Sequence, residues 1–458
     1  MLRRVAGADE ERGGKAGLRA LAAALRRPPI EADALASFRR ERAADATLPI
    51  CYALMEGGFV GVIADKVYHA HPAWIAFATA APMFANLSSV WWARLAERVR
   101  TVPLLVALQA ALVASVAGVA LLPRTELGGA LLMTLLVVAR IAIGAIVTVR
   151  SLVWTRNYPR AVRARVTSRL AILSQGVMAA TAALAGAVLD RHETALPWLY
   201  AAGAVVGVLG VWSYAGVRLR ESGGDASAAS PAPERIGAFR LLREDPLYAR
   251  YLGWQFLLGV SNMMIEPAVV YAVSREMGAG YGTSIALVVV VPTVLSVATL
   301  PLWAGWVDRM HAAEFRAKHS WLWVLSQGVM GLGTILGSVF WIGFGRVVFG
   351  IARGGGNLAW SLGHNDFAHP ERAGLYMGVH ATLTGLRGVF APFLGMLLYL
   401  GADARALPGG FVLPALPALG GWMMVLAAGL ALVATLGFAR LQREVERRRR
   451  AAPLASSR

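Results

Sequence analysis

Two short stretches of the sequence, 211 residues apart, follow the same pattern. The first reads Trp92-Ala93-Arg94-Leu95-Ala96-Glu97-Arg98, and the second reads Trp303-Ala304-Gly305-Trp306-Val307-Asp308-Arg309. Each begins with Trp-Ala, ends with an acid followed by Arg, and directly follows an apolar run. The match indicates an internal repeat, a feature that determines the whole architecture of a chain.

Other residues recur at nearly the same separation, between 206 and 211 positions. The recurring pairs are Glu56 with Glu266, Pro82 with Pro292, Arg140 with Arg346, Gly144 with Gly350, and Trp154 with Trp360. Several matches at one offset predict a duplicated chain. If each half holds six membrane spans, both halves start on the same side and are parallel repeats about an axis normal to the membrane.

The composition favours a membrane protein, with 57% hydrophobic and only 16% charged residues, against about a quarter charged in soluble domains. Twelve apolar segments are each long enough to cross about 30 Å of hydrocarbon as a helix. We expect spans at residues 44–66, 73–93, 102–122, 128–149, 168–189, 196–217, 248–273, 283–304, 319–338, 340–361, 373–400 and 411–438.

The predicted fold is all-α, a polytopic membrane protein of 12 transmembrane helices in two pseudo-symmetric six-helix bundles. The bundles are assigned to residues 44–217 and 248–438. A linker, residues 218–247, contains a run of small and polar residues typical of flexible connections. Basic tails are assigned to residues 1–43 and 439–458.

The net charge of +18 reflects topology. Arginines concentrate in the tails and in alternate loops, which predicts that both termini are cytoplasmic in a cell (inner or cytoplasmic) membrane. The opposite loops hold only scattered cations, namely Lys66, Arg124, Arg191, Arg275 and Arg405. This distribution argues against nucleic-acid binding and favours contact between the basic tails and anionic membrane lipid.

Several classes of function are excluded by what the sequence lacks. With one cysteine, Cys51, no intramolecular disulfide or cysteine metal cluster is expected. The first 47 residues are too charged for a cleaved signal peptide, so the first span is expected to act as an uncleaved insertion signal. The sequence contains no Walker motif, nucleophile elbow or zinc motif, so neither an enzyme, an ATP-driven pump nor a cofactor is predicted.

The duplicated loops resemble a signature of the major facilitator superfamily, Gly-x-x-x-Asp-Arg-x-Gly-Arg-Arg. The positions that carry this resemblance are Ala93, Glu97 and Arg98 in the first copy, and Ala304, Asp308 and Arg309 in the second. Both copies have Ala where the family has its first Gly, which puts the tight glycine packing of the loop in doubt. The resemblance implies a cytoplasmic gate in which acid–Arg pairs and helix ends hold the halves together in one state.

A second, shorter signature is Arg140 with Gly144 in the fourth span. In the family, Arg-x-x-x-Gly at this place is associated with proton-coupled antiport. The resemblance therefore implies a secondary active transporter that moves a small-molecule substrate by alternating access, with protons as the coupling ion.

Four charged residues lie inside apolar spans, where ionised groups are expensive and are usually paired, cavity-facing or neutralised. They are the repeat-related pairs Glu56 with Glu266 and Arg140 with Arg346. We predict that Glu56 pairs with Arg140 and Glu266 with Arg346, that these pairs open and re-form during transport, and that the carboxylates carry the proton. The alternative is that they are static ion pairs that fix the helix register.

Other polar residues in the spans are candidates for substrate contact. His380 and Arg387 are seven residues apart and share one helical face. Asn86 and Asn262 are candidates for the cavity wall, with helix–helix hydrogen bonding as the alternative.

Near the end of the tenth span, Asn357, His364, Asn365 and Asp366 are assigned to the cytoplasmic gate or to loop capping. A metal site is not predicted there, because consecutive residues point in different directions. Gly354-Gly355-Gly356 is not a phosphate loop and is expected to allow close packing or local unwinding.

The sequence thus predicts a monomeric, proton-coupled secondary transporter of a small polar solute. Two alternatives stay open: an exporter of amphipathic drugs or lipids, and a transporter-like receptor or assembly factor.

Overall fold

The computed structural model describes residues 32–220, 238–368, 372–406 and 412–455. The chain divides into two compact units. We call the first the N-terminal unit; its described part is residues 32–220 together with Glu266–Val294. The C-terminal unit holds residues 238–265 and the described residues from Leu295 onward. A piece from the second half of the sequence therefore belongs to the unit built mainly from the first half.

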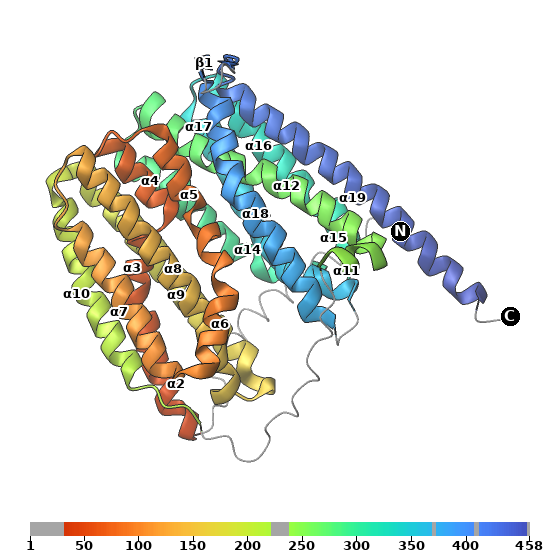
Figure 1. Ribbon diagram of the computed structural model, residues 1–458, viewed down its shortest axis with the longest axis horizontal. Coiled ribbons are helices and arrows are strands. Elements are labelled where there is room, and N and C mark those ends of the chain that lie inside the picture. The colour runs from red at the N-terminus through yellow and green to blue at the C-terminus, as the bar shows by residue number, and fades with distance from the viewer. Residues whose placement is uncertain (1–31, 221–237, 369–371, 407–411, 456–458) are drawn as a thin grey trace, which may run out of the picture. The chain divides into compact units, whose positions relative to one another are not determined.

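The N-terminal unit consists of helices (Figure 1). Its elements are α2 (Ala32–Asp45), α3 (Leu48–Leu54), α4 (Gly57–Lys66), α5 (Pro72–Leu87), α6 (Ser89–Arg98), α7 (Thr101–Val119), α8 (Glu126–Asn157), α9 (Arg160–Arg191), the 3-10 turn η1 (Glu193–Ala195), α10 (Leu196–Ala215), the π-helical turns η2 (Ala272–Glu276) and η3 (Ala286–Val290), and α13 (Tyr281–Ile285). Within it α7 packs against α8 and α10, α5 packs against α4 and α8, and α9 packs against α3 and α13.

The C-terminal unit is also helical, with one small hairpin. Its elements are α11 (Ala238–Glu244), most of α12 (Pro246–Tyr271) and of α14 (Val291–Val307), α15 (Ala312–His319), α16 (Trp321–Ile335), α17 (Val339–Leu362), the 3-10 turn η4 (Gly363–Asp366), α18 (Ala373–Leu400), β1 (Arg405–Ala406), β2 (Val412–Leu413) and α19 (Gly421–Ala455). Here α16 packs against both α17 and α19, and β1 pairs with β2 in antiparallel register.

Eight helices of the described chain are long and apolar enough to cross a membrane, or up to nine if one bent pair counts as a single span. Helices lie within all twelve predicted segments. Two of the helices outside the count are α16, which has only 15 residues, and α17, which carries Arg346 and Arg353 within its apolar run. The prediction of an all-α, polytopic membrane protein is confirmed.

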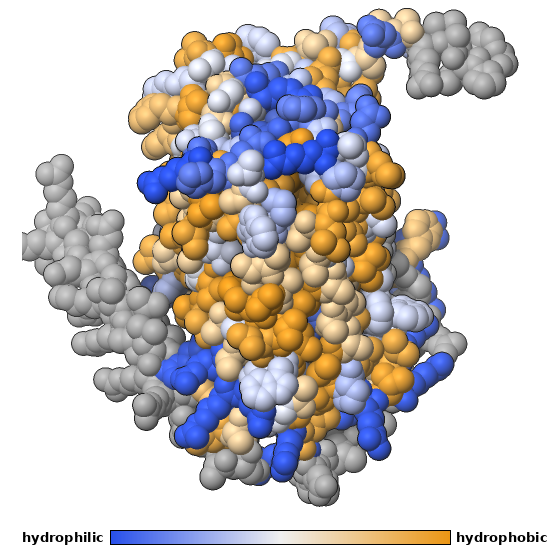
Figure 2. Space-filling view, turned by 90° about the vertical axis from the view of Figure 1, so that its left-hand side faces the viewer, coloured by the Kyte–Doolittle hydropathy of each residue, from blue (hydrophilic) through white to orange (hydrophobic). Residues whose placement is uncertain are grey.

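The outer surface of α10 explains why a bilayer suits this chain. Its exposed side chains are large and apolar, including Trp198, Val205, Val208, Leu209 and Trp212, each more than half exposed. Figure 2 shows one face of the molecule on which hydrophobic side chains fill the middle and hydrophilic ones gather towards both ends. Lipid tails accept such a surface without the penalty that water imposes.

Two predicted spans differ from the structure. The first, 44–66, is bent by 42° between α3 and α4, where the sequence was interpreted as one continuous helix. The last, 411–438, begins only at Gly421. Pro414 and Pro417 lack the N–H groups that a helix needs, so the apolar residues before Gly421 take extended structure, with Ala402 bridged to Leu416.

Candidate functional site

The first candidate is the break in the first span, at Glu56. The residue is extended (φ −74°, ψ 135°) and forms the N-cap of α4. Its carboxylate accepts hydrogen bonds from the backbone N–H groups of Gly58 (2.7 Å) and Phe59 (3.0 Å). Directly after the break, Gly57 allows α4 to lie close to α5, since a Cβ at Gly57 would come within 2.3 Å of the carbonyl oxygen of Ala78.

The capped helix changes the interpretation of Glu56. Two N–H groups and the positive end of a helix dipole stabilise its charge. Among the described residues the carboxylate makes no ion pair, so the predicted Glu56–Arg140 pair is not formed in this conformation. The carboxylate is bound by the helix cap and not by an arginine, and a continuous helix would have no such cap at this position. Arg140 lies half-buried on α8.

The other predicted charges in the spans lie within continuous helices. Glu266 is half-buried in α12, directly before Pro267. Arg346 is fully buried in α17, with its guanidinium 4.3 Å from the ring centre of Phe349. The pairing of Glu266 with Arg346 stays a prediction. Asn262 accepts a hydrogen bond from the side-chain amide of Gln327 on α16, as the alternative of helix–helix hydrogen bonding requires.

An ion pair in the N-terminal unit joins the two halves of the sequence. The buried carboxylate of Asp65, at the end of α4, lies 2.6 Å from Nε of Arg275 in η2. It also accepts a hydrogen bond from the Ser274 hydroxyl at 2.5 Å. Arg275 in turn donates to the carbonyl oxygen of Ala70 at 3.1 Å. We call Asp65, Ser274 and Arg275 the closure.

Further contacts strengthen this end of the unit. Lys66 donates to the carbonyl oxygen of Ser274 at 3.2 Å. Asp190, near the end of α9, accepts from the backbone N–H of Gly282 at 2.9 Å. A Cβ at Gly186 would come within 3.0 Å of the Cα of Gly282, so α9 and α13 touch through glycine. Residues 272–285 are thus held to the first half by charge, hydrogen bonds and close backbone packing.

Sequence reasoning missed the closure, although a signal was present. Asp65 and Arg275 are 210 positions apart, the same offset that relates Glu56 to Glu266. Residues next to the axis between two repeats meet their own counterparts. The scattered cation Arg275 therefore has its partner at the position that the duplication itself marks.

A second missed cluster is buried where α2, α8 and α9 meet. Arg150 on α8 binds both carboxylate oxygens of Asp45, at 2.7 and 2.5 Å, and lies 3.4 Å from Glu41. Glu41 also accepts from the Trp154 indole at 2.8 Å and from the Tyr158 hydroxyl at 2.7 Å. We call these five residues the paired cluster. Its two acids lie on α2, in and next to the segment that the sequence assigned to a tail.

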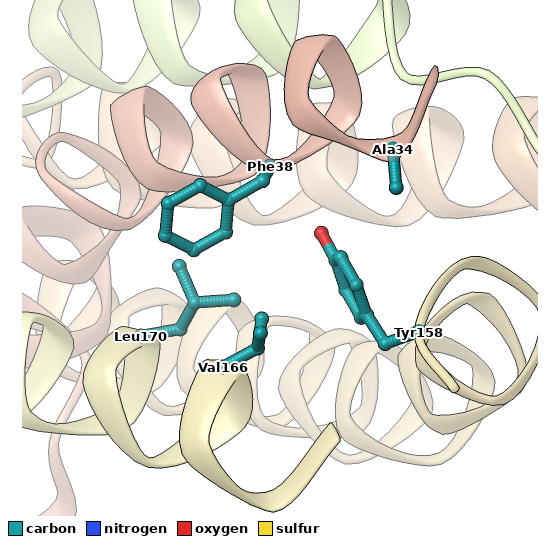
Figure 3. Close-up of a cluster of buried hydrophobic side chains, with 5 residues drawn as sticks. All are labelled: Ala34, Phe38, Tyr158, Val166 and Leu170. Atoms are coloured by element: carbon teal, nitrogen blue, oxygen red, sulfur yellow. The ribbon is translucent and has the colours of Figure 1, made fainter. Parts of the chain in front are cut away.

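Apolar packing places α2 over this cluster. Ala34 and Phe38 of α2 face Tyr158 and the α9 residues Val166 and Leu170 (Figure 3). Burial, and then the negative charge of Glu41, raise the pKa of Tyr158 well above its usual range. Its hydroxyl therefore stays protonated and donates to Glu41.

The C-terminal unit contains a third polar cluster, around α18. Trp360, the counterpart of Trp154 at the offset of 206, donates to the Thr384 hydroxyl at 3.1 Å. The ring of His380 lies 5.6 Å from that of Trp360. Arg387 donates to the backbone carbonyl of Gln255 at 2.5 Å. The predicted His380 and Arg387 are 1% and 4% exposed, so both are interior residues of one helix.

The predicted gate loops are only partly described. Asn86 lies in α5, and Ala93 and Glu97 lie in α6, but their side chains are outside the described residues. The described members are Arg98, Asp308 and Arg309, which are exposed, and Ala304, which is half-buried in α14. The latch between these loops stays a prediction.

The polar residues after α17 cap a neighbouring helix. Asp366 accepts from the backbone N–H of Ala312 at 2.6 Å, at the start of α15. Burial lowers the pKa of His311, while the negative charge of Asp366 acts in the opposite direction. Nδ1 of His311 accepts from the N–H of Ala313 at 3.2 Å. Asn357 and Asn365 are exposed, and His364 is buried in η4. Asn365, Asp366 and Asp308 line a pocket of about 240 Å³.

The three consecutive glycines of α17 pack closely and do not unwind the helix. A Cβ at Gly354 would come within 2.7 Å of the Ser296 carbonyl oxygen, and one at Gly355 within 2.6 Å of the His319 ring. Of the two predicted roles, close packing is therefore the one observed.

No family model and no curated protein matches this sequence. Solved structures do match its fold. A point mutant of the nucleoside transporter NupG matches with a TM-score of 0.66 and 10% identity, over 88% of this chain and 99% of that one. A D-xylose-proton symporter matches with a TM-score of 0.61 and 12% identity, over 88% and 97%. A POT family transporter in complex with 5-aminolevulinic acid matches with a TM-score of 0.65 and 12% identity, over 89% and 96%.

These likenesses span nearly the whole of each solved chain. The chain therefore has the fold of these membrane transporters, which is the fold that the resemblance to the major facilitator superfamily implies. At such low identity the match describes the backbone, and function is argued from the residues.

Proposed function

We propose that this protein is a secondary active transporter that moves a small polar solute by alternating access, coupled to protons. The observation that carries the proposal is Glu56, a half-buried carboxylate at a helix break inside an apolar span. Broken helices whose N-termini face a polar group are a recurring feature of transporter binding sites. The structural neighbours, which include a D-xylose-proton symporter, support the same class.

The short helix α4 supplies a physical route from proton to gate. Glu56 caps its first turn and Asp65 lies at its end, one helix of ten residues, or about 15 Å, apart. Protonating Glu56 removes a charge that the N-terminus of α4 stabilises. The resulting change in the position of α4 would act directly on the Asp65–Arg275 pair. In this proposal the proton biases which of two states is populated.

The remaining parts of the proposal concern the setting. We infer that the protein lies in the cell membrane as a monomer, with its apolar surface against lipid. We infer that both termini are cytoplasmic, because the arginine-rich loops and tails favour that orientation, and that the closure lies on the opposite side.

Reconstitution in liposomes tests this function. Purified protein is supplied with a proton gradient, and internal pH is followed while nucleosides, sugars, amino acids or small organic acids are added outside. One class is expected to drive proton movement. Glu56→Gln should abolish the pH dependence of transport, whereas Glu446→Gln, at an exposed residue of α19, should not change it. If transport and its pH dependence survive both Glu56→Gln and Glu266→Gln, proton coupling through these residues is wrong.

A further inference from the structure

Two buried arginines of the C-terminal unit have no carboxylate partner among the described residues. Arg316 on α15 is 2% exposed and Arg387 on α18 is 4% exposed. Each donates to a backbone carbonyl, Arg316 to Gly356 at 3.4 Å and Arg387 to Gln255 at 2.5 Å. A carbonyl dipole accepts a hydrogen bond but neutralises no charge. Burying an uncompensated guanidinium costs several kcal/mol, so this arrangement needs an explanation.

Several polar atoms around these arginines are buried without a hydrogen-bond partner in the described structure. They are Nε of Arg316 and of Arg387, both ring nitrogens of His380, Nδ1 of His364, the Tyr251 hydroxyl and Oε1 of Gln255. More than nine in ten buried polar groups in proteins are satisfied. Seven such atoms on a few neighbouring elements indicate a site for a ligand.

The unsatisfied groups lie close together. The charges of Arg387 and Arg316 both act on the His380 ring, and they act on each other. A Cβ at Gly259 would come within 2.1 Å of Cζ of Arg387, so the guanidinium lies flat against α12.

The chemistry of these atoms selects an anion. Arginine offers only donors, a neutral histidine offers one donor, and a tyrosine hydroxyl donates readily. Arginine forks match the oxygens of carboxylate and phosphate groups. A cation would meet two like charges here, and an apolar ligand would leave the donors unsatisfied.

The internal repeat supports the same conclusion independently. At the offset of 210, the acids Glu41 and Asp45 of the paired cluster correspond to the neutral residues Tyr251 and Gln255. In the first half, carboxylates of the chain itself neutralise a buried arginine. In the second half, the positions equivalent to the two acids carry no charge, and the buried arginines Arg316 and Arg387 lie at positions that do not correspond to Arg150.

We propose that Arg316, Arg387 and His380, with Tyr251 at the edge, bind the oxyanion of the transported solute, a carboxylate or a phosphate group. This inference names the solute class and therefore rests on the proposed function. The oxyanion supplies the negative charge that Glu41 and Asp45 supply in the other half.

Thermal unfolding of the purified full-length protein in detergent tests the proposal without requiring transport. Inorganic phosphate and succinate are titrated separately against chloride at constant ionic strength. We expect at least one to raise the apparent Tm saturably, by about 3–5 °C at a hundredfold excess over half-saturation. The two titrations distinguish a phosphate-bearing from a carboxylate-bearing ligand.

Three variants locate the effect. Arg387→Gln and Arg316→Gln should each weaken the anion affinity, as measured from the saturable Tm shift, at least tenfold. The two arginines lie on different helices, so if one variant does not fold, the other still tests the site. Arg353→Gln removes an exposed arginine of α17 and should keep the shift. A general salt effect would not saturate and would be equal in all variants.

The proposal is overturned if neither anion gives a saturable shift to the wild type, or if both site variants retain it. If liposomes carry a neutral or cationic solute while no anion binds, the transporter function stands and the oxyanion site is wrong. If anions bind but no solute class moves, the reverse holds.

Discussion

The two units bury arginine in opposite ways. In the N-terminal unit, Arg150 is bound by two carboxylates and is packed beside the Trp154 ring. In the C-terminal unit, around the equivalent Trp360, Arg316 and Arg387 contact only backbone carbonyls among their described hydrogen-bond partners. The same duplicated framework therefore holds one complete charge cluster and one that lacks its anion. A complete cluster suits a fixed structural role, whereas an incomplete one is suited to a ligand.

The largest expected effect is the loss of Arg150. Arg150→Gln leaves Glu41 and Asp45, which are 0% and 3% exposed in their side chains, without a counter-charge. Removing one partner of a buried pair destabilises by about 3–5 kcal/mol. We expect the apparent Tm to fall by many degrees. Arg156→Gln, at an exposed residue of the same helix, is the matched control, and an equal effect in both would refute the structural role.

Removing a buried arginine from the other unit should change stability in the opposite direction. Arg387→Met removes a buried charge with no described carboxylate partner and keeps much of the side-chain volume. Without added oxyanion we expect the protein to be stabilised by about 1 kcal/mol or more, because a desolvated charge is lost. Chemical or thermal unfolding measures this. A loss of several kcal/mol would mean that Arg387 is as structural as Arg150.

The Asp65–Arg275 ion pair of the closure is expected to contribute less free energy than a fully buried ion pair, because it is partly exposed. Its Arg275 side chain is 32% exposed and its Asp65 side chain 2%, between the extremes of a buried and a surface pair. Arg275→Gln should shift the population towards opening about tenfold, or roughly 1.4 kcal/mol. The rate at which a thiol reagent labels a cysteine introduced at Ala70 would report this. Unchanged labelling would exclude a gating role.

Two further changes each remove a single hydrogen bond, one from each of the two clusters. Tyr158→Phe removes a donor to Glu41, and Thr384→Val removes the acceptor of Trp360. A hydrogen bond to a charged acceptor is worth about 1.5–3 kcal/mol and a neutral one about 1 kcal/mol. We expect Tyr158→Phe to lower stability more than Thr384→Val. The reverse order would show that the paired cluster is not the better-ordered network.

Much of the fold could be predicted from the sequence, because apolar length and a repeat are local or periodic signals. The break at Glu56 was missed, since the apolar residues on either side hide a helix cap in a hydropathy count. The start of α19 was missed because apolar residues before Gly421 outweighed two prolines.

The candidate site was predicted only in part. Glu56, His380 and Arg387 could be selected as candidates because polar residues in apolar spans are conspicuous, and their roles stay predictions. The helix cap that Glu56 forms was not predicted, because it depends on a helix break, and the pairing of Glu56 with Arg140 during transport stays a prediction. Arg150 with Glu41 and Asp45 left no local trace, since more than 100 positions separate the arginine from the acids.

The Asp65–Arg275 pair has a consequence for the history of the gene. These positions are equivalent in the two halves, at the offset of 210. In an ancestral homodimer with two-fold symmetry, a residue beside the axis would face an identical copy of itself. Two aspartates or two arginines would repel there. An acid facing a base at this place requires two copies whose sequences have diverged, so this ion pair arose after the duplication.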